Sequence, residues 1–319
     1  MAKYKVCITD VRHESYEIER RILEEIGAEL VPCNCSSAED IIRSCADADG
    51  LLLDLAPCTA EAIQGLQRCK VINRYGAGYD NVDVEAATAK GIQVTYVPDY
   101  CMEDVSDHAL ALMLSCLRQV AYRDRNIRGG KWNMKDQGFR IAGKTLGVLG
   151  FGRIARALVK KCSGFGLAHI LAYDPYVPAE AMSEFGVEKA SMDEVLAQSD
   201  FLSLHMAVTP ETHGIVNAQA LAKMKPTAIL VNVTRGQLVD DEALIDALRQ
   251  KRIFAAGLDT HNHEPLPPES PFFALDNVIL TDHTAYNTAE GTVELKTKSA
   301  RNIADVLTGK KPVYAVNQL

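Results

Sequence analysis

One segment constrains the fold of this chain more than any other: residues 144–175, with the sequence KTLGVLGFGRIARALVKKCSGFGLAHILAYDP. Residues 145–149 are a short apolar run of the length of a buried strand. The run leads into GFGRIA, which matches the pattern G-x-G-x-x-G/A with Ala155 in the third place. Gly150 permits a tight turn, Gly152 lets the backbone approach a pyrophosphate, and Ala155 keeps the following helix close to the strand. The segment therefore predicts a strand, a glycine turn and a helix that bind a dinucleotide.

The residues after the turn favour NAD as that dinucleotide. A helix over 153–162, beginning with Arg153 and Ile154, points its free N–H groups and its positive dipole end at the phosphates. The next apolar run, 169–173, ends at Asp174, whose carboxylate would hydrogen-bond the ribose 2′-OH and repel a 2′-phosphate. Two alternatives stay open on these residues alone: glycines that serve only packing, and sites for FAD or S-adenosylmethionine, which use similar turns.

Composition and charge argue against several classes of protein. With 319 residues the chain exceeds the usual size of one hydrophobic core, so we expect two domains. Its net charge of −8 argues against nucleic-acid binding, and no apolar run is long enough to span a membrane. The N-terminus enters a strand pattern directly, which predicts no signal peptide, and nine scattered cysteines are typical of reduced thiols in the cytoplasm. Cys33 and Cys35 have no second pair at zinc-ligand spacing, so no metal site is predicted.

Strand and helix patterns alternate along the chain, which predicts an α/β protein with two doubly wound parallel-sheet domains. The smaller, flavodoxin-like domain is expected to comprise 1–98 and 290–319, because the last helical pattern follows the completed nucleotide-binding part and packs back on the first domain. The larger Rossmann domain is expected to comprise 99–289. Within it, 103–128 has the periodicity of one long amphipathic helix. The polar arm at 129–142 suits a subunit interface, and a role within one chain is the alternative.

Two loops of the smaller domain follow predicted strands, where open α/β sheets bind their ligands. One contains Gly76, Ala77 and Gly78, whose backbone N–H groups could hold a carboxylate. The same glycines could equally serve only a turn with positive φ. The other loop, LDLAP at 53–57, has no basic residue.

Three polar residues lie at or just beyond the ends of three successive predicted strands of the larger domain: Arg235, Glu264 and His283. A guanidinium pairs with a carboxylate in a planar geometry with two hydrogen bonds. A histidine exchanges the proton of a hydroxyl group near neutral pH. A carboxylate bonded to that histidine orients it and favours its protonated form. Each residue alone could have a purely structural role, but the three side chains together fit the active site of a dehydrogenase.

The chain resembles, over nearly its whole length, the D-isomer-specific 2-hydroxyacid dehydrogenases, the family of the phosphoglycerate, glycerate and D-lactate dehydrogenases. The likeness lies in five separated motifs, which are Arg74-Tyr75-Gly76-Ala77-Gly78-Tyr79-Asp80-Asn81-Val82-Asp83, the Gly150 turn, Asn232-x-x-Arg235-Gly236, Leu258-Asp259 with Glu264-Pro265, and His283. The resemblance implies that His283 is the catalytic acid/base, that Glu264 is its partner, and that Arg235 binds the carboxylate and carbonyl of the substrate.

The resemblance also implies a cofactor, a substrate site and an assembly. Asp259 would contact the nicotinamide carboxamide, and the backbone of Gly76, Ala77 and Gly78 would bind the substrate carboxylate. The predicted cofactor-binding residues are then Gly150, Gly152, Arg153, Ile154, Asp174, Val233 and Asp259. Members of the family are usually homodimers joined through the NAD-binding domains, with the active site in the cleft between the two domains.

The predicted function is NAD-dependent hydride transfer to a small 2-oxo acid, and two departures from the family pattern bear on it. Asp54 stands in the loop where phosphoglycerate dehydrogenases have an arginine, which argues against a phosphorylated substrate. Asp282 replaces the usual proline before the catalytic histidine, and its charge would either perturb His283 or face solvent. The residues near Asp259 and Tyr286 look somewhat like the C-terminal-binding-protein corepressors. An NAD(H)-sensing interaction module with weak or vestigial activity is therefore the alternative.

Overall fold

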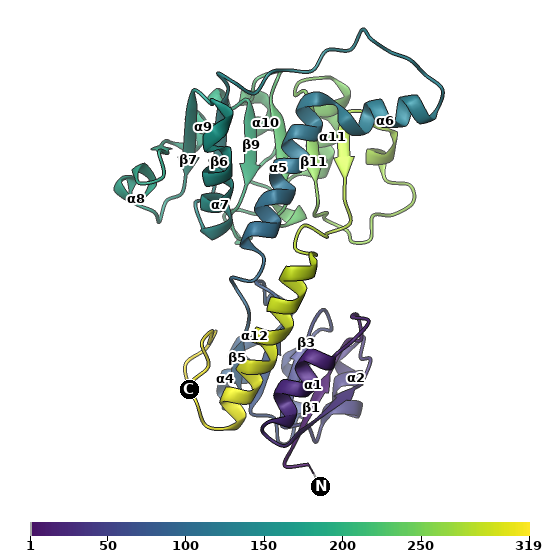
Figure 1. Cartoon of the computed structure of the whole chain (residues 1–319), viewed down its shortest axis with the longest axis vertical. Helices are drawn as coiled ribbons and strands as arrows, with labels where there is room; N and C mark the ends of the chain where they lie inside the picture. Colours follow the sequence, from purple (N-terminus) through teal and green to yellow (C-terminus); the bar gives the residue numbers. More distant parts are fainter. Residues whose placement is uncertain (1) are drawn as a thin grey trace. The chain divides into compact units, whose positions relative to one another are not determined.

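The computed structural model describes residues 2–319, which divide into two compact units (Figure 1). The first unit consists of residues 2–101 and Asn287–Leu319, and the second of Met102–Tyr286. Each unit has its own parallel sheet with helices packed on it, so the predicted fold class of two parallel-sheet α/β domains is confirmed. No helix within residues 2–319 is both long enough and apolar enough to cross a membrane.

The five-stranded sheet of the first unit has the order β2-β1-β3-β4-β5, which is the flavodoxin-like order, and all its pairings are parallel. Its strands are short, and β3 (GLLL) is apolar and buried at every residue. The strands are β1 (Tyr4–Ile8), β2 (Ala28–Pro32), β3 (Gly50–Leu53), β4 (Val71–Arg74) and β5 (Gln93–Thr95). The helices are α1 (Glu17–Glu24), α2 (Ala38–Cys45), α3 (Ala60–Gly65), α4 (Val84–Ala89) and α12 (Ala289–Leu307).

The C-terminal helix α12 completes the first unit. It packs against α1, β3 and β4, and buried Asn302 joins it to the sheet. The Asn302 side chain donates to Asn73 Oδ1 at 2.9 Å and to the carbonyl oxygen of Tyr96 at 3.0 Å. A side chain on Gly50 would lie 3.4 Å from Ile303, so this helix covers β3 closely. A sheet formed mostly by the first hundred residues is thus covered by the last part of the chain.

The seven-stranded sheet of the second unit has the order β12-β11-β10-β9-β6-β7-β8, again with every pairing parallel. The order reverses between β6 and β9, which is the point where sheets of this kind bind nucleotides. The strands are β6 (Thr145–Leu149), β7 (His169–Tyr173), β8 (Glu188–Lys189), β9 (Phe201–Leu204), β10 (Ile229–Asn232), β11 (Ala255–Leu258) and β12 (Val278–Leu280). The helices are α5 (Met102–Arg118), α6 (Val120–Arg128), α7 (Arg153–Cys162), η1 (Ser163–Phe165), α8 (Ala179–Ser183), α9 (Met192–Gln198), α10 (Ala218–Lys223), η2 (Gly236–Leu238), α11 (Asp241–Arg249) and η3 (Pro271–Ala274).

The structure corrects the prediction of one helix over 103–128. Gln119 has left-handed backbone angles (φ 56°, ψ 36°) and separates α5 from α6. Helix α5 buries an apolar face against β10 and β11, whereas α6 has no buried residue. The break lets the chain leave the sheet once the apolar face of α5 is buried. The arm that follows is exposed, with 81% of both Trp132 and Met134 accessible to solvent.

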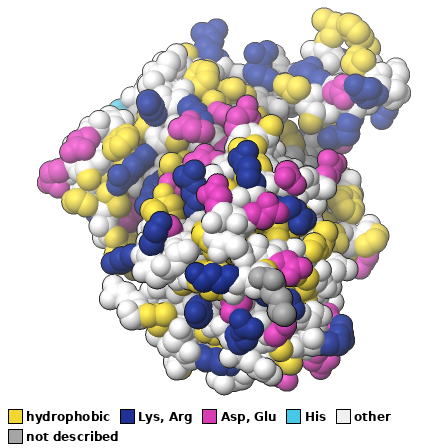
Figure 2. All heavy atoms as spheres, turned by 60° about the horizontal axis from the view of Figure 1, so that its bottom comes forward, with side chains coloured by type: hydrophobic (Ala, Val, Ile, Leu, Met, Phe, Trp, Pro, Cys, Tyr) yellow, Lys and Arg dark blue, Asp and Glu magenta, His cyan; other side chains and the backbone are white. Residues whose placement is uncertain are grey.

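Charged side chains of both signs are interspersed on the face that Figure 2 shows. Lysines and arginines lie beside aspartates and glutamates there, and no block of one sign covers this face. This mixture is typical of an ordinary solvent-exposed protein surface, so the net charge of −8 is not gathered in one patch of this face.

Candidate active site

The glycine turn after β6 has the geometry of an anion-binding helix start. Gly150 has φ +88°, and a side chain there would lie 2.6 Å from the carbonyl oxygen of His205, so only glycine fits. Around Gly152 the situation is the opposite, because a side chain there would meet nothing within 4 Å. Gly152 is also the N-cap of α7, with no side-chain hydrogen bond to the helix. The turn therefore leaves both open space and N–H groups without a capping side chain, which is what a pyrophosphate requires.

Asp174 lies beside this turn, where its carboxylate could hydrogen-bond the ribose of a bound dinucleotide. One carboxylate oxygen accepts a hydrogen bond from the backbone N–H of Phe151 at 2.8 Å, and the other accepts one from that of Tyr176 at 2.9 Å. Arg153, which is exposed, and Ile154, which is partly buried, form the first turn of α7 next to it. The residues that the sequence assigned to this end of a dinucleotide are thus together, and their geometry fits such a ligand.

Glu264 and His283 form a hydrogen-bonded pair beyond β11 and β12. Glu264 Oε2 and His283 Nδ1 are 2.7 Å apart, and Glu264 Oε1 accepts the backbone N–H of His261 at 2.8 Å. Both carboxylate oxygens therefore have a fixed partner. Burial alone would raise the pKa of Glu264, but the hydrogen bonds from His283 and from the His261 N–H outweigh it and lower that pKa below its usual value. Glu264 is therefore ionised at neutral pH, and Nε2 is the His283 nitrogen that faces away from it.

Asp259 anchors the segment that carries His283. Its carboxylate is fully buried and accepts hydrogen bonds from the Thr281 hydroxyl at 2.6 Å and the N–H groups of Thr284 and Ala285 at 3.1 and 3.0 Å. Its carbonyl oxygen accepts the N–H of His283 at 2.8 Å, where the backbone is left-handed (φ 56°). The buried carboxylate at the end of β11 thereby sets the position of the loop after β12.

Asp282 and His108 are neighbours of this segment. Asp282 is exposed and accepts a hydrogen bond from the Thr284 hydroxyl at 2.8 Å, so its carboxylate faces solvent. His108 on α5, which sequence reasoning missed, lies 3.0 Å from Thr281 Oγ1 and 3.4 Å from Asp259 Oδ1 through its Nε2. Nothing in the sequence links His108 to residues more than 150 positions away, and only the packing of α5 on the sheet reveals it.

Arg235 follows β10, the strand next to β11, and its loop adjoins the loop of Glu264. A side chain on Gly236 would lie 2.1 Å from the carbonyl carbon of His261, so the two backbones touch and position 236 has room only for glycine. Arg235 is partly buried, and one guanidinium nitrogen donates to the carbonyl oxygen of Thr234 at 2.8 Å. Val233 is buried at the start of this loop. The fold therefore places Arg235, Glu264 and His283 at the carboxyl ends of three neighbouring strands.

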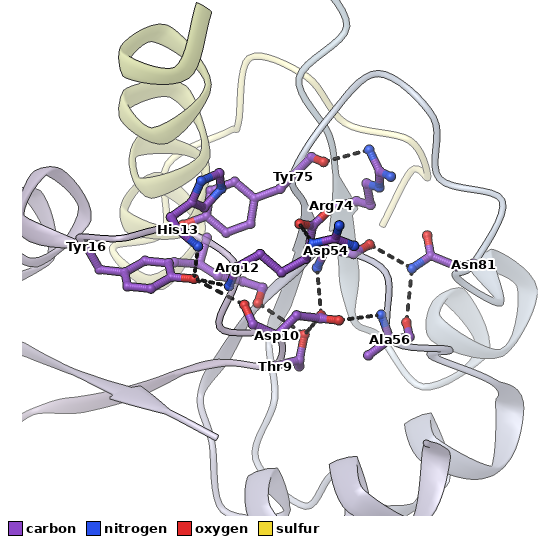
Figure 3. A network of polar contacts seen from close by, with 11 residues as sticks. Thr9, Asp10, Arg12, His13, Tyr16, Asp54, Ala56, Arg74, Tyr75 and Asn81 are labelled. Carbon is purple, nitrogen blue, oxygen red and sulfur yellow. Dashed lines mark hydrogen bonds and ion pairs between the residues drawn. The ribbon is translucent and has the colours of Figure 1, made fainter. Parts of the chain in front are cut away.

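In the first unit, Asp10 joins the loops that follow β1 and β3 (Figure 3). Its carboxylate accepts the backbone N–H groups of Asp54 and Ala56 at 3.1 and 2.8 Å. Asn81 holds the same loop from the other side, since its side chain donates to the carbonyl oxygens of Asp54 and Ala56 at 2.9 and 3.0 Å. Strands β1 and β3 are neighbours where this sheet reverses its order, so these loops lie where open α/β sheets bind ligands.

No motif in the sequence points to Arg12, but the structure places this residue of the loop after β1 beside Asp54 in the loop 53–57 (Figure 3). Its Nε lies 3.8 Å from Asp54 Oδ2, so a guanidinium faces the carboxylate there. Gly76 has φ +133°, and a side chain on it would meet the Arg74 guanidinium at 1.8 Å. The backbone angle therefore favours glycine at Gly76, whereas the Arg74 guanidinium is the end of a flexible side chain that can shift. Ala77 and Gly78 continue that loop, beyond β4.

Together the fold and these side chains define the class of protein. It is a nucleotide-binding α/β protein with an arginine and a glutamate–histidine pair at the edge of its seven-stranded sheet. A sequence model of the "D-isomer specific 2-hydroxyacid dehydrogenase, NAD binding domain" matches residues 110–285. The chain therefore belongs to the D-isomer specific 2-hydroxyacid dehydrogenase family, and its second unit contains that family's NAD-binding domain. This confirms the resemblance seen in the sequence.

Individual relatives agree with this assignment. The chain is 38% identical over 316 residues to a D-3-phosphoglycerate dehydrogenase of Methanocaldococcus jannaschii, which covers 98% of this chain and 59% of the relative. It is 38% identical over 288 residues to a glyoxylate reductase of Korarchaeum cryptofilum, which covers 88% of this chain and 86% of the relative. A solved structure from Thermus thermophilus has a TM-score of 0.89 at 33% identity and covers 98% of this chain and all of that one. The chain thus spans a little over half the length of the phosphoglycerate dehydrogenases and most of the length of the glyoxylate reductase.

Proposed function

We propose that this protein is an NAD-dependent D-2-hydroxyacid dehydrogenase that works mainly as a reductase of a small, unphosphorylated 2-oxo acid. The observation that carries the proposal is the Glu264–His283 pair at 2.7 Å, with Arg235 on the adjoining loop of the NAD-binding unit. Family membership supports the same chemistry. The comparisons give no support to the alternative of an NAD(H)-sensing interaction module.

Each residue has a distinct task in the proposed reaction. Arg235 binds the substrate carboxylate and polarises the carbonyl group through its planar donors. Protonated His283 donates the proton on Nε2 to the carbonyl oxygen, and Glu264 keeps the ring oriented through Nδ1. The backbone N–H groups of the loop at 76–78 hold the substrate carboxylate. When bound, NADH supplies the hydride that reduces the carbonyl carbon.

A substrate panel tests the proposal. NADH oxidation is measured with glyoxylate, hydroxypyruvate, pyruvate, phenylpyruvate, 2-oxoglutarate and phosphohydroxypyruvate. We expect turnover of at least one unphosphorylated acid, and its side chain then defines the pocket. A protein that binds NADH and turns over none of these acids would contradict the proposal.

Asp174 is expected to determine the preference for NADH over NADPH. An Asp174→Asn variant keeps an acceptor for the Phe151 N–H but loses the charge that repels a 2′-phosphate. The ratio of kcat/KM for NADH to that for NADPH should fall by about tenfold or more, because the variant no longer repels the 2′-phosphate of NADPH. A tenfold change corresponds to about 1.4 kcal/mol. Steady-state kinetics with both cofactors measures it, and an unchanged ratio in a folded variant would show that Asp174 is not the discriminator.

Asp54 is expected to oppose a phosphorylated substrate. The Asp54→Asn change removes a negative charge and leaves Arg12 without its ion-pair partner at this position. We expect kcat/KM for phosphohydroxypyruvate, relative to hydroxypyruvate, to rise by about tenfold through the lost repulsion and the freed guanidinium. Asp47→Asn, which breaks an exposed pair with Lys5 in the same unit, is the matched control and should leave the ratio unchanged. A ratio that does not move in Asp54→Asn would mean that this loop does not select the substrate.

We further propose that the protein is a cytoplasmic homodimer joined through the NAD-binding unit. The exposed apolar side chains of Trp132 and Met134, beside the polar helix α6, support this assembly. All nine cysteines are free thiols, which suits the cytoplasm. Trp132→Glu combined with Met134→Glu should shift the mass measured by light scattering from dimer to monomer, whereas Tyr176→Glu, also exposed, should not. A wild-type protein that is monomeric at micromolar concentration would refute the dimer.

A further inference from the structure

Three cysteines from separate elements of the first unit meet in its core. Cys7 lies in β1, Cys33 directly follows β2, and Cys45 is the last residue of α2. Their three sulfur atoms all lie within 4.8 Å of one another. Cys7 and Cys45 are fully buried, whereas Cys33 is partly exposed. The spacing of the cysteines in the sequence does not suggest this group, because the fold assembles it from three elements.

The backbone around Cys33 holds the group in place. The N–H of Cys33 donates to the carbonyl oxygen of Ile8 at 2.9 Å, which extends the pairing of β2 with β1. Asn34 is left-handed (φ 53°), and the chain turns there so that Cys35 is also buried in the same core cluster.

We propose that Cys7, Cys33 and Cys45 form a binding site for a thiophilic d10 metal ion of the Zn²⁺ or Cu⁺ class, held by three thiolates. Sulfur ligands without nitrogen or carboxylate partners select soft cations. Three sulfurs at about 2.3 Å from one tetrahedral ion lie about 3.8 Å apart, so small side-chain rotations bring this group to bonding distance. Each cysteine loses its S–H proton to solvent as its sulfur–metal bond forms.

The burial pattern is that of a metal site with an entry path. Two of the sulfurs are enclosed by the apolar core around β1 and α2, which excludes competing water. Cys33 is the accessible member, and its thiol otherwise makes only long contacts to carbonyl oxygens, at 3.5 Å to Val31 and 3.8 Å to Ser44. An ion can therefore bind first at Cys33 and then engage Cys7 and Cys45. This site lies in the core of the first unit and takes no part in the proposed hydride transfer.

Titration of the reduced, metal-free protein with Cd²⁺ alone tests the proposal, because sulfur-to-cadmium charge transfer reports thiolate ligation directly. We expect saturation at one Cd²⁺ per chain, displacement by Zn²⁺, and a higher Tm with either ion. The Cys33→Ser variant should lose affinity by at least about 100-fold. Cys69→Ser is the matched control, since Cys69 is also partly exposed and its thiol also contacts a carbonyl oxygen, that of Val71 at 3.3 Å.

A second measurement needs no variant and holds even if Cys33→Ser folds poorly. Zn²⁺ should slow the alkylation of Cys33 by iodoacetamide at least about tenfold in the wild-type protein, read out by peptide mass, and should leave Cys69 unaffected. The proposal is overturned if reduced protein shows no saturation at one equivalent of Cd²⁺, if Cys33→Ser and Cys69→Ser bind Cd²⁺ equally well, or if Zn²⁺ leaves the alkylation of Cys33 unchanged.

Discussion

Replacement of His283 by alanine is expected to lower kcat for 2-oxo acid reduction by about 10²–10⁴-fold, which is the usual contribution of a positioned acid or base. Glu264 cannot take over as the proton donor, because a carboxylate that is ionised at neutral pH carries no proton to donate, and its Oε1 still accepts the His261 N–H. Binding of NADH should persist, since the glycine turn and Asp174 are on other loops. Steady-state NADH oxidation and a fluorescence titration of NADH measure the two quantities separately.

Two companion variants distinguish chemistry from disturbance of the loop. His263→Ala removes an exposed histidine from the Glu264 loop and should leave kcat within about twofold of wild type. Glu264→Gln keeps an acceptor for the His261 N–H but loses the charge that supports protonated His283. We expect its kcat to fall by about 10–100-fold, which is a smaller loss than that of His283→Ala. Turnover by His283→Ala within tenfold of wild type would remove His283 from the role of acid.

The Arg235→Lys variant is expected to lose about 10²–10³-fold in kcat/KM, although it keeps the positive charge. A lysine offers a point charge, whereas the substrate carboxylate and carbonyl require the planar donors of a guanidinium. The loop cannot adjust to a new side chain, because Gly236 is in contact with the backbone of His261. A misplacement of about 1 Å in such a site costs about 100-fold in rate. Kinetics at varied 2-oxo acid concentration should show both a lower kcat and a higher KM.

Rescue by a small molecule makes this prediction specific. In Arg235→Ala, added guanidinium should restore part of the lost activity, because it supplies the missing planar donors in a space of the right shape. Arg249→Lys changes an exposed arginine in the last turn of α11 and should be kinetically silent. An Arg235→Lys variant with normal kcat/KM for the 2-oxo acid would mean that the substrate is bound elsewhere.

Much of the fold could be predicted from the sequence because strands and helices of this kind are local patterns. The apolar run at 145–149, the glycine turn and Asp174 follow one another along the chain, and each constrains the next. Arg235, Glu264 and His283 could be chosen as a set because each follows a predicted strand, and parallel strands end at one edge of a sheet. What the sequence provided was their location at a common edge, and the distances came from the structure.

The features that escaped prediction depend on contacts between distant parts of the chain. Gln119 is a good helix former, so its left-handed backbone gives no signal in a helical pattern. Arg12 and Asp54 come from different strand ends, and His108 approaches Asp259 only because α5 packs on β11. In each case tertiary packing decided the outcome, and neither periodicity nor motif spacing reports on it.

The position of α12 has a consequence for how the protein is made. Residues 2–101 of the first unit leave the ribosome early, but their covering helix arrives only after Met102–Tyr286 have been synthesised. At about 5–20 residues per second, that interval lasts about 10–40 s. During this time one face of the β3–β4 region and the side of α1 that faces α12 lack their partner, and by the end of the interval all of the second unit has been synthesised. Of the two units, the one whose translation begins first is therefore the last to be completed, and nascent chains should be most dependent on chaperones in that interval.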